Sequence, residues 1–272
     1  MTEFYTRTQE DFGKHYDSGL GPVIFATYAA DVARRAAAGV TARVLETACG
    51  TGIVTRALLD ALPPGIALTA TDINAERLND ARGKIQPHET VSFKVADATS
   101  LPFPDQSFDT VVCQFGVMFF PDKDKSYQEA LRVLAPGGRY LFSVWDGHRH
   151  NPWARLSHET LSHFFTPELP AFTIAPFAYH SIDPIKESLQ AAGFDSINIS
   201  MLRFRQIVPD LATFAGGMVF GSPVLAEILR RPAIDPVRVQ DALTTAFRRE
   251  FGDTHAVVPM QAILFTAVRP VD

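Results

Sequence analysis

Apolar and polar positions alternate between two kinds of segment from residue 43 onward. Five short runs rich in apolar and β-branched residues predict strands at 43–46, 66–71, 91–96, 107–114 and 139–145. Between them, apolar residues recur at helical spacing in 52–62, 75–84 and 125–134. Strands and helices that alternate at these lengths predict an α/β protein, with a parallel sheet covered by helices on both faces.

The pattern changes after residue 145. Asp183 followed by Pro184 predicts the start of a helix, and Gly193 predicts its end, so we expect a helix over 184–192. Beyond it the pattern predicts a strand at 196–208, helical patches opened by Ser222-Pro223 and Asp235-Pro236, and a last strand at 257–269. Because a helical insert joins the last two strands, they could pair antiparallel at one edge of the sheet.

Three stretches outside the strand–helix core complete the predicted organisation. Residues 1–40 are mostly helical in pattern and form an N-terminal extension to a domain that spans 41–272. A helical insert occupies about 209–252 of that domain. The most apolar stretch, 211–229, is broken by glycines, Pro223 and Glu227, so it predicts two short buried helices and no membrane span.

Composition narrows the functional classes. The chain has 272 residues, 46% of them hydrophobic, which suffices for one large domain with a substantial core. Its 25 basic and 30 acidic residues give a net charge of −5, which argues against a dedicated nucleic-acid binder. Two cysteines exclude a disulfide framework, and no CxxC spacing suggests zinc. The polar N-terminus shows no secretory signal, so we expect a cytoplasmic protein.

A glycine loop follows the first predicted strand. Gly50 and Gly52 allow a tight turn and let a ligand approach the backbone closely. The amides at the start of the next helix favour an anionic group. The loop reads GxGxxT and lacks the third glycine of a dinucleotide loop. The evidence that it binds a ligand therefore comes mainly from its position between a strand and a helix.

Two acids refine the expected ligand. Asp72 ends the second strand, where an acid can accept hydrogen bonds from both hydroxyls of a ribose, although it could also be a capping or surface acid. Glu46 stands directly ahead of the glycine loop, where its charge would oppose a pyrophosphate and suit an ammonium group. The alternative is a structural acid that caps the loop amides. Together the two acids favour S-adenosylmethionine over a dinucleotide.

Further segments in the expected order make a family resemblance specific. They are Val95-Ala96-Asp97-Ala98, the run from Leu101 to Asp109, and the run from Ala130 to Arg139 that contains Pro136-Gly137-Gly138. With the glycine loop, they resemble a class I S-adenosylmethionine-dependent methyltransferase. More narrowly, the chain resembles the ubiquinone/menaquinone-biosynthesis type and related small-molecule methyltransferases. The resemblance covers about residues 43–145.

The resemblance implies a fold and a set of cofactor contacts. The fold is a Rossmann-like, doubly wound, seven-stranded sheet, mostly parallel with an antiparallel edge strand, plus N-terminal helices and a helical insert that acts as a lid. The residues implied in cofactor binding are Tyr16, Glu46, Gly50, Thr51, Gly52, Asp72, Ile73, Asp97, Ala98, Gln114 and Phe115. Among them, Ile73 would pack on the adenine, and Asp97 would accept its amino group.

The expected reaction is in-line transfer of a methyl group, which leaves S-adenosylhomocysteine. Of the 21 phenylalanines, 17 follow residue 100, which favours a small apolar or aromatic acceptor. His148 follows the fifth strand and is the candidate general base, and we expect no metal. The alternatives are an NAD(P)-dependent oxidoreductase, a methyltransferase acting on a macromolecule, and a cofactor-binding regulator. We expect no nucleic-acid partner; a homodimer is possible.

Overall fold

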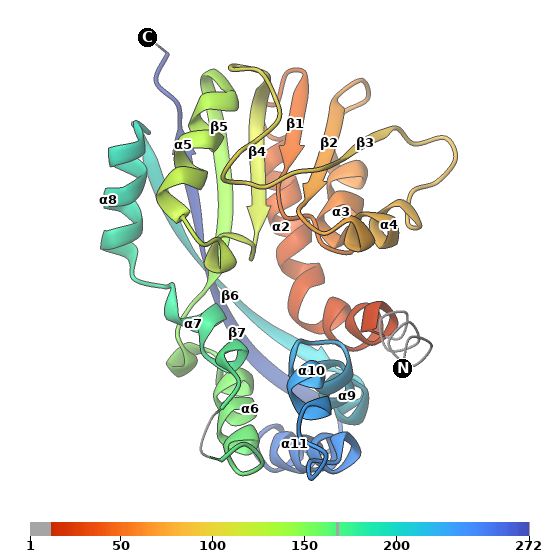
Figure 1. The fold of residues 1–272 in the computed structure, drawn as a ribbon. Coiled ribbons are helices and arrows are strands. Elements are labelled where there is room, and N and C mark those ends of the chain that lie inside the picture. The colour runs from red at the N-terminus through yellow and green to blue at the C-terminus, as the bar shows by residue number, and fades with distance from the viewer. Residues whose placement is uncertain (1–11, 167–168, 272) are drawn as a thin grey trace. The chain divides into compact units, whose positions relative to one another are not determined.

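The computed structural model describes residues 12–166 and 169–271, and it contains one seven-stranded sheet (Figure 1). The strand order is β3-β2-β1-β4-β5-β7-β6. The strands are β1 (Arg43–Glu46), β2 (Ala67–Asp72), β3 (Val91–Val95), β4 (Phe108–Gln114), β5 (Leu134–Trp145), β6 (Ile197–Val208) and β7 (Ala256–Val268). This order confirms the predicted Rossmann-like sheet.

The sheet is parallel from β3 to β5, and β7 then runs in the opposite direction. β1 pairs in parallel with both β2 and β4, and β4 pairs in parallel with β5. β7 runs antiparallel to β5, with Phe142 opposite Phe265, and β6 lies beyond it at the edge. Because chain order proceeds in opposite directions on the two sides of β1, the carboxyl ends of β1 and β4 form the switch point where such sheets bind ligands.

The chain divides into two compact units. The first, called here the sheet unit, comprises Tyr28–Trp145, Tyr179–Leu202 and residues 262–271. The second, called here the helical unit, comprises residues 12–27, Asp146–Ala178 apart from 167–168, and Arg203–Gln261. β6 and β7 contribute residues to both. The expected division into an N-terminal extension and one domain stays a prediction.

The sheet unit also contains helices, some of which begin or end at recognisable caps. They are α2 (Ala26–Ala37), α3 (Ile53–Ala61), α4 (Ala75–Arg82), α5 (Lys123–Val133) and α8 (Ile182–Ala192). The Asn74 side chain caps α4 by accepting from the Glu76 amide at 2.8 Å. The predicted start of α8 was wrong. Ser181 occupies the N-cap, so Asp183 lies in the first turn, where its charge still complements the helix dipole.

β5 begins earlier than the pattern predicted. Leu134 already pairs with Phe108, and the register then shifts so that Thr110 lies opposite Arg139. The segment Pro136-Gly137-Gly138 therefore forms an irregularity inside the strand, where a simple turn ahead of it was expected. Gly137 has a φ of 74°, which a residue with a side chain adopts only at a cost.

The helical unit is built from helices of different lengths. They are the π-helix η1 (Tyr16–Phe25), α6 (Pro152–Ser162), α9 (Leu211–Phe220), α10 (Val224–Leu229) and α11 (Pro236–Phe251), with the short η3 (His148–His150), η4 (Ala171–Thr173) and α7 (Ala175–Ala178). η1 and α9 approach closely, since a Cβ on Gly217 would lie 2.9 Å from the Cα of Gly19. The two short helices expected in 211–229 are confirmed as α9 and α10. No helix of the described residues is long and apolar enough to cross a membrane.

Candidate functional site

The two glycines of the loop between β1 and α3 have different structural tasks. Both adopt the left-handed conformation, with φ values of 55° at Gly50 and 83° at Gly52. A Cβ on Gly52 would lie 2.8 Å from the Cβ of Ala81, so this glycine lets the start of α3 pack against α4. A Cβ on Gly50 would meet nothing within 4 Å. Gly50 therefore sits at an open stretch of backbone that a ligand can approach.

Asp72 joins the end of β2 to this loop. Its Oδ2 accepts from the Gly50 amide at 2.9 Å, and its Oδ1 accepts from the Asn74 amide at 2.9 Å. Since a carboxylate oxygen has two lone pairs, each oxygen keeps one acceptor position beyond these bonds. The structure thus brings together the predicted loop and the predicted acid, and leaves the acid able to accept from hydroxyl groups.

Glu46 is a buried acid at the end of β1, directly before the loop. Only 2% of it is exposed, and its Oε2 accepts from the Thr55 hydroxyl at 2.6 Å. The main-chain oxygen of Glu46 accepts from the Thr71 hydroxyl at 3.0 Å. Burial is the main cause that raises the pKa of Glu46, to about 8, and the negative charge of Asp72 adds to it. A cationic group placed beside this carboxyl would favour its ionised form.

The ends of β2 and β3 present an apolar side chain and a second acid. Ile73 is 69% exposed, which is unusual for isoleucine and suits packing against a flat base. Asp97 lies in a tight turn, because its Oδ1 accepts from both the amide and the hydroxyl of Thr99 at 2.8 Å. The Ala96 amide donates to the Asp72 carbonyl at 3.0 Å, so this turn and Asp72 lie at neighbouring strand ends.

Gln114 and Phe115, at the end of β4, occupy a tightly packed corner. Phe115 has a φ of 55°, a strained conformation for a bulky residue that is often found at functional sites. Its ring stacks on Trp145 with centroids 4.0 Å apart and is 6% exposed. A Cβ on the next residue, Gly116, would lie 2.7 Å from the Cβ of Ala48 in the glycine loop. The β4 corner is therefore fitted against the loop, while the predicted cofactor contacts of Gln114 and Phe115 stay predictions.

Two of the residues predicted for the site belong to the helical unit. Tyr16 stacks on Phe25 within η1, with centroids 5.2 Å apart. His148 lies in η3, and its Nε2 donates to the Thr173 carbonyl at 3.1 Å. Their roles toward the cofactor and the acceptor stay predictions.

The hydrogen bonds of Thr173 fix the tautomers of two histidines. A carbonyl can only accept, so the proton of neutral His148 is on Nε2 and its Nδ1 is basic. The Thr173 hydroxyl donates to the Pro170 carbonyl at 2.9 Å, and therefore accepts from Nδ1 of His158 at 3.1 Å. Burial, together with the charge of His158, lowers the pKa of His148. Among the described residues, no three metal-binding side chains form a group.

The residues that support the candidate site residues through hydrogen bonds were not predicted from the sequence. Thr55 is completely buried nine positions after Glu46, and its place on the inner face of α3 was the available signal. Glu129 and Arg132 lie on α5, and their hydrogen bonds reach back to the loop that follows Asp97. No local pattern indicates these contacts, because they depend on how α5 packs.

Comparisons with known proteins agree with this geometry. The family described as a methyltransferase domain matches residues 45–142. The ubiquinone/menaquinone biosynthesis C-methyltransferase of Hahella chejuensis is 41% identical over 103 residues, which are 37% of this chain and 41% of that protein. The protein of that name from Pectobacterium carotovorum is 30% identical over 171 residues, which are 57% of this chain and 67% of the relative.

A solved structure shows the same fold, and the matched lengths show how much of each relative is similar. The phosphoethanolamine N-methyltransferase 2 of Haemonchus contortus, solved with S-adenosylhomocysteine, superposes with a TM-score of 0.61 at 18% identity, over 95% of this chain and 57% of that one. At that identity it shows the fold alone. The chain spans only about two fifths of the length of the first curated relatives it matches, 41% and 40%.

The matched segment contains the glycine loop, Asp72 and the Asp97 turn, in the order and at the strand ends described above. The Pectobacterium relative extends the match to two thirds of a complete methyltransferase. The chain belongs to the class I S-adenosylmethionine-dependent methyltransferases and resembles their ubiquinone/menaquinone-biosynthesis type.

Proposed function

We propose that this protein moves a methyl group from S-adenosylmethionine to a small apolar or aromatic molecule by in-line displacement. One observation carries the proposal. Asp72 is bonded to the Gly50 amide at 2.9 Å, in the loop that directly follows the buried acid Glu46 at the end of β1. The loop and the two strand ends beside it thus offer the Asp72 carboxylate as an acceptor for hydroxyl groups, the backbone amides at the start of α3, and the Glu46 carboxyl group. Ribose, carboxylate and ammonium groups are the matching parts of S-adenosylmethionine.

In the proposed contacts, the parts of the cofactor bind at the ends of different strands. The loop of Gly50, Thr51 and Gly52 takes the methionine part, and the first amides of α3 take its carboxylate, since amides at a helix start favour anions. Glu46 takes the ammonium group, and Asp72 takes the ribose. The remaining contacts come from Ile73, Asp97 and Ala98 on the adenine, from Gln114 and Phe115 near the methyl group, and from Tyr16.

The main task of the protein in methyl transfer is to align the acceptor with the methyl group. A methyl group on a sulfonium is already activated, so the site has to orient the acceptor and exclude water. A base is needed only when the acceptor must lose a proton. We assign that task to His148, because its lowered pKa keeps the ring neutral at pH 7 and its Thr173 bond leaves Nδ1 basic.

An aromatic acceptor is the first candidate. The Hahella relative is named for C-methylation in ubiquinone and menaquinone biosynthesis, and quinone precursors are apolar aromatic molecules. The aromatic side chains of the helical unit contribute less to this assignment than their number suggests. Phe214 is 1% exposed and stacks on Phe247 at 5.3 Å, so it belongs to a packed core.

Two measurements test the proposal. Isothermal titration of the purified protein should show binding of S-adenosylhomocysteine and none of NAD. Incubation with S-adenosylmethionine and a panel of reduced naphthoquinones and simple phenols should then yield S-adenosylhomocysteine and a methylated product. Binding of NAD alone would favour the oxidoreductase alternative. Methyl incorporation into added RNA or protein, with none into the small molecules, would favour the macromolecular one.

A further inference from the structure

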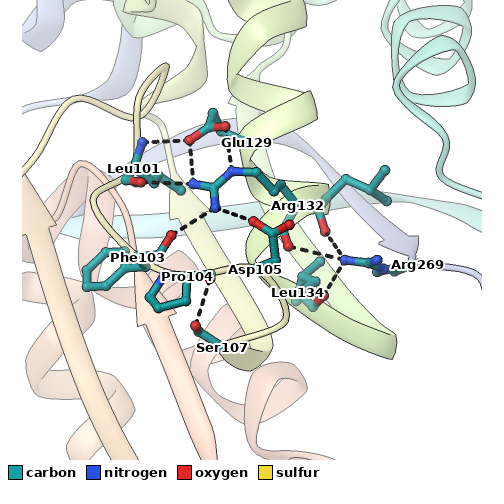
Figure 2. A network of polar contacts seen from close by, with 10 residues as sticks. Leu101, Phe103, Pro104, Asp105, Ser107, Glu129, Arg132, Leu134 and Arg269 are labelled. Atoms are coloured by element: carbon teal, nitrogen blue, oxygen red, sulfur yellow. Dashed lines mark hydrogen bonds and ion pairs between the residues drawn. The ribbon is translucent and has the colours of Figure 1, made fainter.

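An ion pair on α5 holds the loop that follows β3. The guanidinium of Arg132 donates to both oxygens of Glu129, from Nε to Oε1 and from Nη2 to Oε2, each at 2.8 Å. Its Nη1 also donates to Asp105 at 2.7 Å. Figure 2 shows these groups around Arg132, with the loop from Leu101 to Asp105 on one side. One helical turn therefore supplies a planar donor and a carboxylate to the same stretch of chain.

Both backbone groups of Leu101 bond to this pair. The Leu101 amide donates to Oε2 of Glu129 at 2.7 Å, and the Leu101 carbonyl accepts from Nη2 of Arg132 at 2.9 Å. The Phe103 carbonyl accepts from Nη1 of Arg132 at 2.8 Å. Three main-chain groups of the loop are thus fixed by two side chains from one helix (Figure 2).

The pair is partly withdrawn from solvent and depends on the shape of arginine. The Glu129 side chain is 9% exposed and that of Arg132 is 31% exposed. Hydrogen bonds from Arg132 lower the pKa of Glu129, so the carboxylate is charged at neutral pH. The guanidinium presents five donors in a rigid plane, whereas a lysine ammonium is a compact charge that cannot serve four separate acceptors in this geometry.

The fixed residue Leu101 comes directly after the Asp97 turn. The turn is closed by the Ser100 amide, which donates to the Asp97 carbonyl at 3.0 Å, and by the Thr99 amide, which donates to Oδ1 of Asp97 at 2.8 Å. One end of the turn continues from β3, which pairs with β2. The other end is Leu101. The Glu129–Arg132 pair therefore determines where the second end of the turn lies.

We propose that Glu129 and Arg132 are positioning residues that hold the Asp97 turn in the geometry needed to recognise the 6-amino group of adenine. The inference rests on the proposed function, since it concerns the base of the same cofactor. A carboxylate discriminates for an amino group only when it lies within hydrogen-bond distance of it. A turn anchored at both ends keeps that distance, and a turn anchored only at β3 does not.

The chain supplies a matched control in Arg269. Its Nη1 donates to the carbonyl of Leu131 at 2.9 Å, at the C-terminal end of the same helix. It also donates to the carbonyl of Leu134 at 2.7 Å (Figure 2). Its third side-chain bond, at 3.2 Å, is to the carbonyl of Arg132, and among the described residues none of its hydrogen bonds reaches 97–105. Loss of Arg269 should therefore disturb α5 without releasing the turn.

The experiment compares two ligands across three variants. Dissociation constants are measured by isothermal titration for S-adenosylhomocysteine and for its analogue whose purine lacks the 6-amino group. The wild-type protein should prefer S-adenosylhomocysteine by at least about tenfold, as expected for one hydrogen bond to a charged acceptor. In Arg132→Lys and Glu129→Gln, affinity for S-adenosylhomocysteine should fall about tenfold and affinity for the analogue less than about twofold. The ratio of the two dissociation constants should then approach one in these two variants. Arg269→Gln should keep the wild-type ratio.

Each other outcome overturns the inference. A preference retained in both α5 variants, or lost equally in Arg269→Gln, would show that the pair has only a general structural role. A wild-type protein that binds both ligands equally would remove the adenine assignment itself. Glu129→Gln keeps an acceptor for the Leu101 amide, so it decides the question if Arg132→Lys does not fold. Failure of the wild-type protein to bind S-adenosylhomocysteine would instead contradict the proposed function.

Discussion

The carboxylate of Asp72 and the backbone amide of Gly50 are joined by a hydrogen bond of 2.9 Å. This bond connects the end of β2 to the glycine loop after β1. The amide of Asn74 takes the second oxygen, also at 2.9 Å, so both oxygens face donors. The acid thus shapes the loop and also offers acceptors to a ligand.

Replacement of Asp72 by Asn should weaken binding of S-adenosylhomocysteine. An asparagine has one oxygen where two are needed, so its amide group would face the amide of Gly50 or of Asn74. We expect a loss of about 1–3 kcal/mol in binding free energy, typical of a charge-assisted hydrogen bond. The measurement is isothermal titration, with Asp80→Asn as control because Asp80 is an exposed acid on α4. Unchanged affinity in a folded Asp72→Asn protein would contradict the ribose assignment.

Glu46 should make the stability of the protein depend on pH. The folded pKa of about 8 lies above the ordinary value of 4.5, so the folded protein binds a proton that the unfolded chain releases. The stabilising contribution is complete below about pH 4.5 and is lost as pH rises toward 8. Relative to Glu46→Gln, the free energy of unfolding of the wild type should therefore fall between pH 5 and 8. Urea unfolding at pH 5, 6.5 and 8 measures this, with Glu76→Gln as surface control.

The same carboxyl should release a proton when S-adenosylmethionine binds. A cation beside Glu46 lowers its pKa, so the bound complex ionises this group and affinity rises with pH between about 6 and 7.5. Isothermal titration in buffers of different ionisation enthalpy counts the released protons. The Glu46→Gln variant should release none. Equal release by wild type and variant would place the ammonium group elsewhere.

The two loop glycines should respond differently to alanine. Gly50→Ala meets no neighbour within 4 Å and has only the left-handed backbone to accommodate, at about 1–2 kcal/mol. Gly52→Ala adds a contact of 2.8 Å with the Cβ of Ala81, so it should be the more destabilising of the two. Ala81→Gly should recover part of that difference. A double-mutant cycle of unfolding free energies measures the coupling, and additive effects would contradict the packing argument.

His148→Ala should slow turnover without weakening cofactor binding. A general base typically contributes about 10²–10⁴ in rate. Because its pKa lies below the ordinary value, the wild-type rate with a reactive phenol should be near its plateau at pH 7 and fall at lower pH. His163→Ala is the control, since that side chain is exposed at the end of α6. If His148→Ala retains most of its turnover, the proton is removed by another group or by water.

The core of the fold could be predicted from the sequence because its signals are local. β1, β2, β3 and β4 lie within one residue of the predicted runs, since each is a short apolar segment bounded by polar turns. β5 was predicted to start at residue 139, and it starts at Leu134 because the strand tolerates an irregularity at Pro136-Gly137-Gly138. The irregularity fits the sheet only because the register of pairing with β4 shifts there, and the sequence of β5 alone does not indicate that register.

Most candidate site residues could be located from the sequence because they stand at or directly after the ends of predicted strands. Glu46, Gly50 and Asp72 follow strands whose parallel pairing brings their ends together. Thr55 and Arg132 are different, because their contacts join residues 9 and 31 positions apart and depend on how helices pack. Helix packing of this kind leaves no local pattern, so the roles of Thr55 and Arg132 were not predicted, while the ligand contacts of Glu46, Gly50 and Asp72 stay predictions.

The antiparallel pairing of β5 with β7 sets the smallest piece of this protein that can be cut out for study. The family match ends at residue 142, yet the partners of Arg139–Trp145 are Val268–Ala262, near the far end of the chain. A fragment trimmed to the matched segment would leave an apolar strand edge open to other chains and invite aggregation. Exchange of the helical unit between relatives likewise calls for several splice points, because this unit is drawn from three separate lengths of chain.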